Sequence, residues 1–192
     1  FWNWDAPKGM QMPSMYEDSN SPLYDPLRDA PHRRPTLIDL NYHLNADPNN
    51  QQVPINQQVA INLTIMHRQM ISSGKTACLF LGTPYRAGEV DPIQAAGCIE
   101  HVPHNTVHDW TGDRLKDHHE NMGHFYSAAR DPIFYAHHSN LDRMWTIWKN
   151  LPGGNRHNFN VQYWLDTRFI FYDENKQLMR VKLRDCLNNE EL

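Results

Sequence analysis

One short stretch of the sequence gathers side chains that can bind a metal ion. The ten residues "HVPHNTVHDW", at 101–110, contain three histidines. Residues four apart project from the same face of a helix, so the imidazoles of His104 and His108 can reach one ion. Pro103 suits the first turn of a helix and disfavours helical geometry before it, which leaves His101 outside the helix as the weaker candidate. The chain has 12 histidines, so one pair with this spacing is also compatible with chance.

A third ligand is expected from a second helix. The segment "DPIFYAHHSNLDRMWTIWKNLPGG" predicts a helix over 131–151, with Asp131 as its N-cap and a Pro-Gly-Gly stop after it. Helical geometry does not separate His137 from His138 as the ligand; we favour His138, with Asp142 one turn later as its hydrogen-bond partner. A lone histidine on an apolar helix face is as often a hydrogen-bonded core residue, but three on two facing helices favour a metal.

Three neutral imidazoles that leave one coordination position open suit catalytic zinc or copper. Copper is favoured by intrinsic affinity and zinc by availability. A zinc metalloprotease of the HExxH type needs a glutamate directly after its first histidine, whereas Asn105 follows His104. The general base of that class is therefore missing.

The elements around these histidines predict a mainly helical chain with long irregular loops. Residues 1–57 are rich in Pro, Asn, Asp and Ser and predict irregular structure with brief turns. A helix is predicted over 58–71, and Asp91-Pro92 opens a short helix toward Gly97. The expected buried stripe of the 58–71 helix consists of apolar residues three or four apart: Val59, Leu63, Met66 and Met70.

The C-terminal region predicts a β-hairpin. Two alternating runs in "TRFIFYDENKQLMRVKLRD" flank an Asp-Glu-Asn-Lys turn. The apolar residues available for burial on this hairpin are Phe169, Phe171, Met179, Val181 and Leu183.

Composition excludes several other classes of function. The 192 residues suffice for one domain with a core, and a net charge of −4 with scattered lysines and arginines offers no face for nucleic acid. The longest apolar runs are far shorter than the roughly 20 residues of a membrane-spanning helix. Three cysteines without CxxC spacing exclude a disulfide scaffold but leave one bridge open. The opening "FWNWDAPKGM" lacks an initiator methionine and a leader pattern and carries two indoles that need burial, so we expect a fragment or a processed piece.

Four stretches closely resemble the plant polyphenol oxidases, the catechol oxidase and tyrosinase family. They are "FWNWDAPKGM", "HNTVHDWTGD", "MGHFYSAARDPIFYAHHSNLDRMW" and "FYDENKQLMRVKLRDC", and together they run through nearly the whole chain. The resemblance implies a type-3 site, in which two coppers, each held by three histidines, bind dioxygen together within a four-helix bundle. It also implies that His104, His108 and His138 are the ligands of the second copper.

The same resemblance implies the extent of the domain. The family's first-copper helices lie upstream of its "FWNWDAPKGM" stretch, with which this chain opens. Residues 1–192 are therefore expected to be a partial tyrosinase-type copper domain, the second-copper half, without the first-copper half and the C-terminal shielding domain. One copper is expected from this chain and two from the complete enzyme.

The activity that the resemblance implies is oxidation of o-diphenols to o-quinones by O2, with hydroxylation of monophenols as a second activity. Phe125 matches the family's gate residue over the second copper, while Glu100 and Asn105 match positions that hold a water near it. The implied partners are small phenols and O2, and the implied location is the thylakoid lumen of plastids. The alternatives are a hemocyanin-like oxygen carrier and a non-catalytic fragment that binds a single metal.

Overall fold

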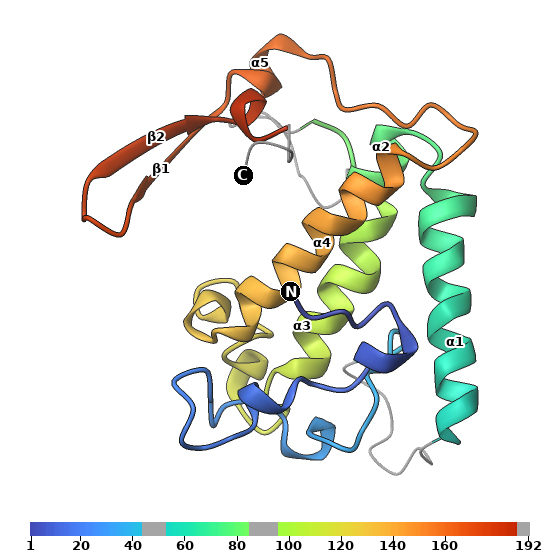
Figure 1. Cartoon of the computed structure of the whole chain (residues 1–192), viewed down its shortest axis with the longest axis vertical. Coiled ribbons are helices and arrows are strands. Elements are labelled where there is room, and N and C mark those ends of the chain that lie inside the picture. Colours follow the sequence, from blue (N-terminus) through green and yellow to red (C-terminus); the bar gives the residue numbers. More distant parts are fainter. Residues whose placement is uncertain (44–52, 85–95, 188–192) are drawn as a thin grey trace.

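A computed structural model describes residues 1–43, 53–84 and 96–187 of the chain, and this part is mainly helical. Helices α3 (Thr106–Thr111) and α4 (Ile133–Lys149) lie side by side at the centre, and α1 (Ile55–His67) flanks them (Figure 1). A two-stranded antiparallel hairpin projects from the helical body at the end of the molecule where α4 terminates. The predicted class, mainly α with long irregular loops and a C-terminal β-hairpin, is confirmed.

The other regular elements are short. They are α2 (Ala77–Leu81), α5 (Gln162–Leu165), β1 (Arg168–Tyr172) and β2 (Leu178–Lys182). One π-helical turn, Arg68–Ser73, follows α1, and another, Glu100–Asn105, precedes α3. Single 3-10 turns lie at Pro7–Gly9, Ser14–Tyr16, Ala30–His32, Asp117–His119, Ala128–Arg130 and Leu183–Cys186. The short helix predicted from Asp91 lies largely outside the described residues.

Helix α1 buries most of its predicted stripe. Met66 is buried, and Val59 and Met70 are partly buried against the core. Leu63, also expected in the core, is 42% exposed, whereas Asn62 is fully buried.

Asn62 faces inward because it bonds to buried loop backbone. Its side-chain amide donates to the Ile38 carbonyl (2.7 Å) and accepts from the backbone amide of Leu40 (3.1 Å). The N–H and C=O groups of irregular backbone have no partners in a helix or sheet, so buried ones need others. Asn62 supplies them, and Leu63 beside it is left exposed.

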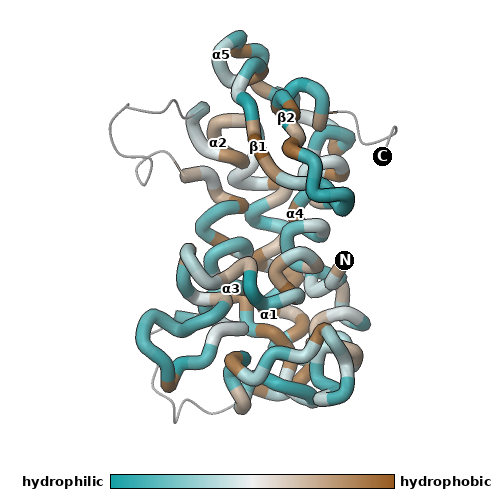
Figure 2. Tube along the Cα trace, turned by 90° about the vertical axis from the view of Figure 1, so that its left-hand side faces the viewer, coloured by the Kyte–Doolittle hydropathy of each residue, from teal (hydrophilic) through white to brown (hydrophobic). Residues whose placement is uncertain are grey.

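The two indoles of the opening stretch are buried against the central helices, as they required, whereas the Phe1 ring is 69% exposed. Trp2 and Trp4 are 1% and 0% exposed. The Trp2 backbone amide donates to the Ala136 carbonyl of α4 (3.0 Å), and its ring lies 6.3 Å from that of Trp110 on α3. Figure 2 shows hydrophilic stretches in the peripheral loops and the hairpin turn, whereas apolar residues recur along the helices. The core therefore runs from the opening stretch across α3 and α4 and extends to α1 and α2.

The hairpin has the predicted strands but not the predicted burial. Phe169 pairs with Val181 and Phe171 pairs with Met179, so these four side chains share one face. Phe169 is 52% exposed, Phe171 50% and Met179 39%. The prediction of burial is wrong for these three, because the hairpin extends away from the helical body (Figure 1).

The three cysteines are not bonded to one another. Cys78 and Cys186 are exposed, Cys98 is partly buried, and all three are free thiols. Within the described ranges, no helix has the length and apolar character needed to cross a bilayer.

A buried ion pair fixes the start of α4. The Asp131 carboxylate accepts from the Ile133 amide (2.9 Å), so it caps the helix as predicted, although regular structure begins at Ile133. The same carboxylate receives Arg28 through two bonds, of 2.8 and 2.5 Å, and both residues are nearly inaccessible to solvent. Arg28 also donates to the carbonyls of Leu23 and Tyr16. The Arg28 guanidinium therefore bonds both to the residue that precedes α4 and to backbone carbonyls of the N-terminal segment.

We predict that Arg28→Ala lowers the free energy of unfolding by about 3–5 kcal/mol, because it leaves the Asp131 charge buried without a partner. Urea denaturation followed by circular dichroism measures the change. The matched control is Arg184→Ala, which removes an exposed pair with Asp166 and should leave stability nearly unchanged. Equal losses in the two variants would contradict the assignment.

Candidate metal centre

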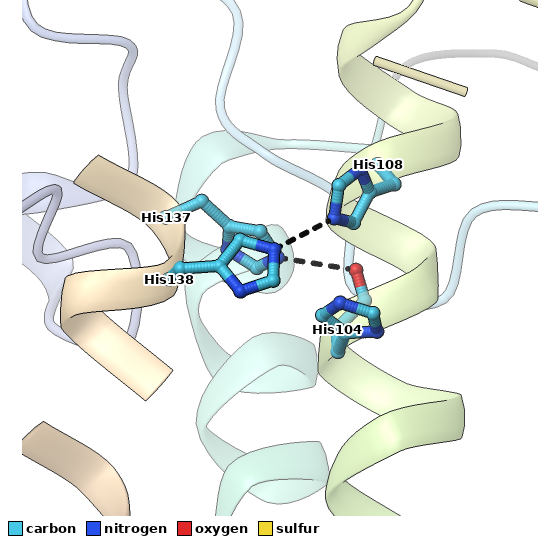
Figure 3. Close-up of side chains that lie close together, drawn as sticks. All are labelled: His104, His108, His137 and His138. Carbon is cyan, nitrogen blue, oxygen red and sulfur yellow. Dashed lines mark hydrogen bonds between the residues drawn. The ribbon is translucent and has the colours of Figure 1, made fainter. Parts of the chain in front are cut away.

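Four histidines from two neighbouring helices converge on one point (Figure 3). His104 lies in the turn that leads into α3, His108 lies in α3, and His137 and His138 lie in α4. One ring nitrogen from each lies within 4.8 Å of the others. Across the described part of the chain this is the one group of at least three such side chains close enough to hold an ion. The three histidines chosen from the sequence are thus brought together, with His137 beside them.

The backbone before α3 decides which histidines join the cluster. Val102 is extended (φ −143°, ψ 120°) and interrupts the helical turn. His101, on the far side of this break, is exposed and does not join, as predicted. Helical geometry resumes after Pro103, and the rings of His104 and His108 lie 4.7 Å apart, centroid to centroid.

Hydrogen bonds set the protonation of His104 and His108. Nδ1 of His104 lies 2.8 Å from the side-chain oxygen of Asn105, and Nδ1 of His108 lies 2.7 Å from the carbonyl oxygen of Met122. Both oxygens accept only, so each Nδ1 carries the proton. The lone pair of a neutral ring is then on Nε2, which is available to a metal.

In His137 the proton lies on Nε2 instead of Nδ1. The ring is fully buried, and its Nδ1 accepts from the indole N–H of Trp4 (3.1 Å). Its proton must then be on Nε2, which lies 3.3 Å from the carbonyl oxygen of His104. Both nitrogens therefore have protein partners, and neither offers a free lone pair.

The remaining ring, His138, faces His108. Their Nε2 atoms are 3.2 Å apart. Two nitrogens that bind one ion at about 2.0–2.1 Å with near-tetrahedral angles lie about 3.3 Å from each other. The chemistry of the donor set also fits copper, which accepts neutral imidazole readily. The residues present therefore suit a copper ion.

Burial keeps these rings neutral. It is the largest cause that lowers the pKa of His108 and of His138 to about 4, and neighbouring imidazoles lower both pKa values further. Burial also lowers the pKa of His104, against the hydrogen bond to Asn105 and the charge of Glu100, which raise it. The pKa of the fully buried His137 lies well below the ordinary 6.5. At neutral pH the lone pairs are therefore not occupied by protons.

The other residues singled out from the sequence occupy three environments. Asn105 contacts His104 directly, whereas Glu100 is an exposed carboxylate at the edge of a cavity of about 330 Å³. This cavity reaches the metal-binding rings and has a mixed acidic and apolar lining: Phe80, Leu81, Ile99, Glu100, His104, His138, Leu141, Asp142 and Trp145. Phe125 is 96% exposed on the loop between α3 and α4, so it is not a core residue.

Two contributors to the site were not predicted from the sequence. The Trp4 indole engages His137 from 133 positions away, and the Met122 carbonyl orients His108 from a loop. Only the need of the Trp4 indole for burial hinted at the first contact. A backbone carbonyl has no residue signature, so no sequence pattern indicated the second.

Comparison with known proteins gives two matches to family models. The common central domain of tyrosinase matches residues 1–151, and the polyphenol oxidase middle domain matches residues 158–192. The chloroplastic polyphenol oxidase A1 of Vicia faba is 56% identical over 193 residues, which is 100% of this chain and 31% of that protein. The chain spans about a third of the length of the curated relatives it matches.

Solved structures agree with the fold. The structure of latent apple tyrosinase matches with a TM-score of 0.91 and 54% identity, over 99% of this chain and 40% of that one. A structure of active aurone synthase, described with a copper B, matches with a TM-score of 0.91 and 39% identity, over 100% of this chain and 55% of that one.

We predict that the metal-free chain loses stability as the pH falls from 6.5 toward 4. An unfolded histidine takes up a proton near pH 6.5, whereas His108 and His138 resist protonation until about pH 4 when folded. Lowered folded-state pKa values give stability that is complete above 6.5 and is lost as the pH falls through this window. Thermal unfolding at half-unit pH steps measures it. His108→Leu should flatten the profile, and an unchanged profile would show that this ring is not the cause.

Proposed function

Since this chain belongs to the tyrosinase family, in the branch of the plant polyphenol oxidases, we propose that it supplies a copper site for the oxidation of o-diphenols to o-quinones by O2 in the complete protein. His104, His108 and His138 are the proposed ligands. The observation that carries the proposal is the convergence of three rings, two of which have Nδ1 hydrogen-bonded and Nε2 left for a metal, beside a fourth ring whose nitrogens are both engaged.

Copper supplies the dioxygen and electron-transfer chemistry that turns two o-diphenols and one O2 into two o-quinones and two waters. The chain's own residues prepare the site for it. Asn105 and the Met122 carbonyl keep the protons of His104 and His108 on Nδ1, and burial keeps the rings neutral. Fixed ring orientation and proton position are what outer hydrogen-bond partners contribute to a metal site.

Phe125 is the proposed substrate gate. Its 96% exposed ring stands on the same loop that sends the Met122 carbonyl to His108. An exposed aromatic ring offers a flat apolar face on which a phenol can stack. The family resemblance assigns this role, and the exposure of the ring agrees with it.

Glu100 and Asn105 are proposed to hold a water that takes the proton of a monophenol before it binds. Asn105 uses its amide oxygen on His104, so its NH2 group is the part that can donate to a water. Glu100 can accept from the same water, since its carboxylate borders the cavity lined by His104 and His138. A carboxylate that accepts from a water makes it a better base, and the amide fixes the position of the water.

The proposed partners and cellular location are based on the related proteins. Phenols and O2 are the proposed small-molecule partners. Relatives named chloroplastic support a plastid location, and the thylakoid lumen is proposed from the family resemblance. One copper is expected from these three histidines and a second from a histidine set elsewhere in the complete protein.

We predict that the copper-loaded complete protein oxidises catechol and that His138→Ala abolishes both copper retention and this activity. Two imidazoles alone form a weak site, so copper should pass to a chelator. The control is His137→Asn, whose side-chain oxygen can still accept from Trp4; it should keep most of the copper. Metal analysis after dialysis and quinone absorbance measure the two effects.

Equal copper loss in both variants would contradict the choice of His138 over His137 as the third ligand. Reversible oxygen binding without quinone formation in the parent protein would instead support an oxygen carrier and overturn the enzymatic proposal.

We predict that Asn105→Asp lowers tyramine hydroxylation at least tenfold while catechol oxidation changes less than about threefold. The carboxylate keeps an oxygen for the N–H of His104 but cannot donate to the water. Initial rates on the two substrates measure the ratio. Asn105→Leu is the comparison, because it also removes the acceptor for His104 and should depress both activities. Equal effects of Asn105→Asp on both substrates would refute the water-holding role.

A further inference from the structure

The loop between α3 and α4 controls one of the proposed ligands through its backbone. Met122 is 1% exposed, and its carbonyl oxygen lies 2.7 Å from Nδ1 of His108. If this carbonyl moves away, the ring of His108 loses the acceptor that fixes its orientation. Its proton can then move to Nε2, where it blocks a metal. The position of one peptide group therefore governs the availability of His108.

A buried carboxylate holds the residue next to that peptide group. The side-chain nitrogen of Asn121 donates to Oδ2 of Asp25 across 2.8 Å, and the two residues are 9% and 7% exposed. The other oxygen of Asp25 accepts from the Leu27 amide (2.8 Å), which fixes the carboxylate itself. The Asn121 carbonyl accepts from the hydroxyl of Ser127 (3.0 Å). Asn121 is thus tied at both its side chain and its backbone.

The same N-terminal segment also holds both ends of the loop. The Asp29 amide donates to the Thr111 carbonyl where α3 ends (3.0 Å), and Arg28 pairs with Asp131 where α4 begins. These contacts fix the ends but lie nine or more residues from Met122 along the chain. Among the bonds of the described residues, the one that Asn121 donates to Asp25 ties this segment to the centre of the loop. A hydrogen bond to an ionised acceptor is about twice as strong as a neutral one, which suits this task.

We propose that Asp25 is a positioning residue for the copper site: by holding Asn121 it keeps the Met122 carbonyl on His108 and so keeps Nε2 of His108 open. The inference rests on the proposed function, which makes His108 a ligand. Asp25 touches neither the metal-binding nitrogens nor a substrate and acts through the loop.

The test compares Asn121→Ala and Asp25→Ala with the exchanged pair, Asp25→Asn combined with Asn121→Asp. The exchanged pair keeps one amide–carboxylate bond with the donor on the other side, and the new amide at position 25 retains an oxygen for Leu27. In the complete protein without copper, ¹⁵N chemical shifts of the labelled histidines report which nitrogen of His108 carries the proton. Competition with a chelator then gives the copper affinity.

Each single variant should move part of the His108 population to the Nε2–H form and lower copper affinity by about 10–100-fold. The exchanged pair should restore both. The control is Asn62→Ala, which also removes a buried amide that anchors irregular backbone, but on α1. It should reduce stability and leave the His108 proton and the copper affinity unchanged.

A folded Asn121→Ala protein with His108 still protonated on Nδ1 and copper affinity within about threefold of the parent would overturn the inference. So would an exchanged pair that folds without restoring either property. If Asn121→Ala does not fold, Asn121→Ser, whose hydroxyl is too short to span the gap to Asp25, is judged by the same criteria. The proposed function and the role of Asp25 fail on different results. Copper retention by His108→Ala would refute the proposed function, whereas the proton position on His108, measured without copper, decides the role of Asp25.

Discussion

The ring of His137, fully buried and hydrogen-bonded on both nitrogens, is the constraint on which the site depends. Trp4 donates to one nitrogen, and the other faces the carbonyl of His104. A neutral imidazole satisfies two partners only if one donates and the other accepts, so the ring has one allowed orientation. It therefore links the opening stretch, α4 and the start of α3 in a fixed arrangement. His138, the next residue along α4, is directed toward His108 as a consequence.

Long irregular segments hold this arrangement through side chains in place of regular backbone ladders. Asp5, in the opening stretch, accepts from Arg143 (2.6 and 2.7 Å) and from Asn140 (2.9 Å), both on α4. Arg28 and Asn62 do the same for other loops by bonding to buried carbonyls. Each buried polar side chain replaces the partners that water would give the backbone, so loss of one leaves several groups unsatisfied. The position of α4 against the opening stretch consequently depends on the bonds to Asp5, whereas Asn62 secures loop backbone beside α1.

Local sequence predicted the parts of the molecule that depend on short-range geometry. The four-residue spacing of His104 and His108 places both rings on one helix face. The choice of His138 over its neighbour could not be made this way, because it is decided by Trp4, 133 residues from the ring that it engages. The exposure of Leu63 on α1 has the same origin, since Asn62 is buried to bond distant backbone. The apolar face of the hairpin stays half exposed because no element of the described ranges covers it. The hydrophobic pattern indicates which residues favour burial, whereas the position of the element that would bury them depends on distant parts of the chain.

The metal-free site is held by contacts that a metal ion would replace. The Nε2 atoms of His108 and His138 lie 3.2 Å apart, at hydrogen-bond distance. Because the proton of His108 is on Nδ1, its Nε2 accepts, and a neutral His138 ring donates from Nε2. Metal binding then requires the proton of His138 to move to Nδ1, so that both Nε2 lone pairs face the ion. Burial lowers the pKa of both rings to about 4 and so opposes a second proton on either ring. Because protons and metal compete for the same nitrogens, the burial that lowers the pKa values also extends metal binding to lower pH. The loops and His137 thus position the three rings before an ion binds.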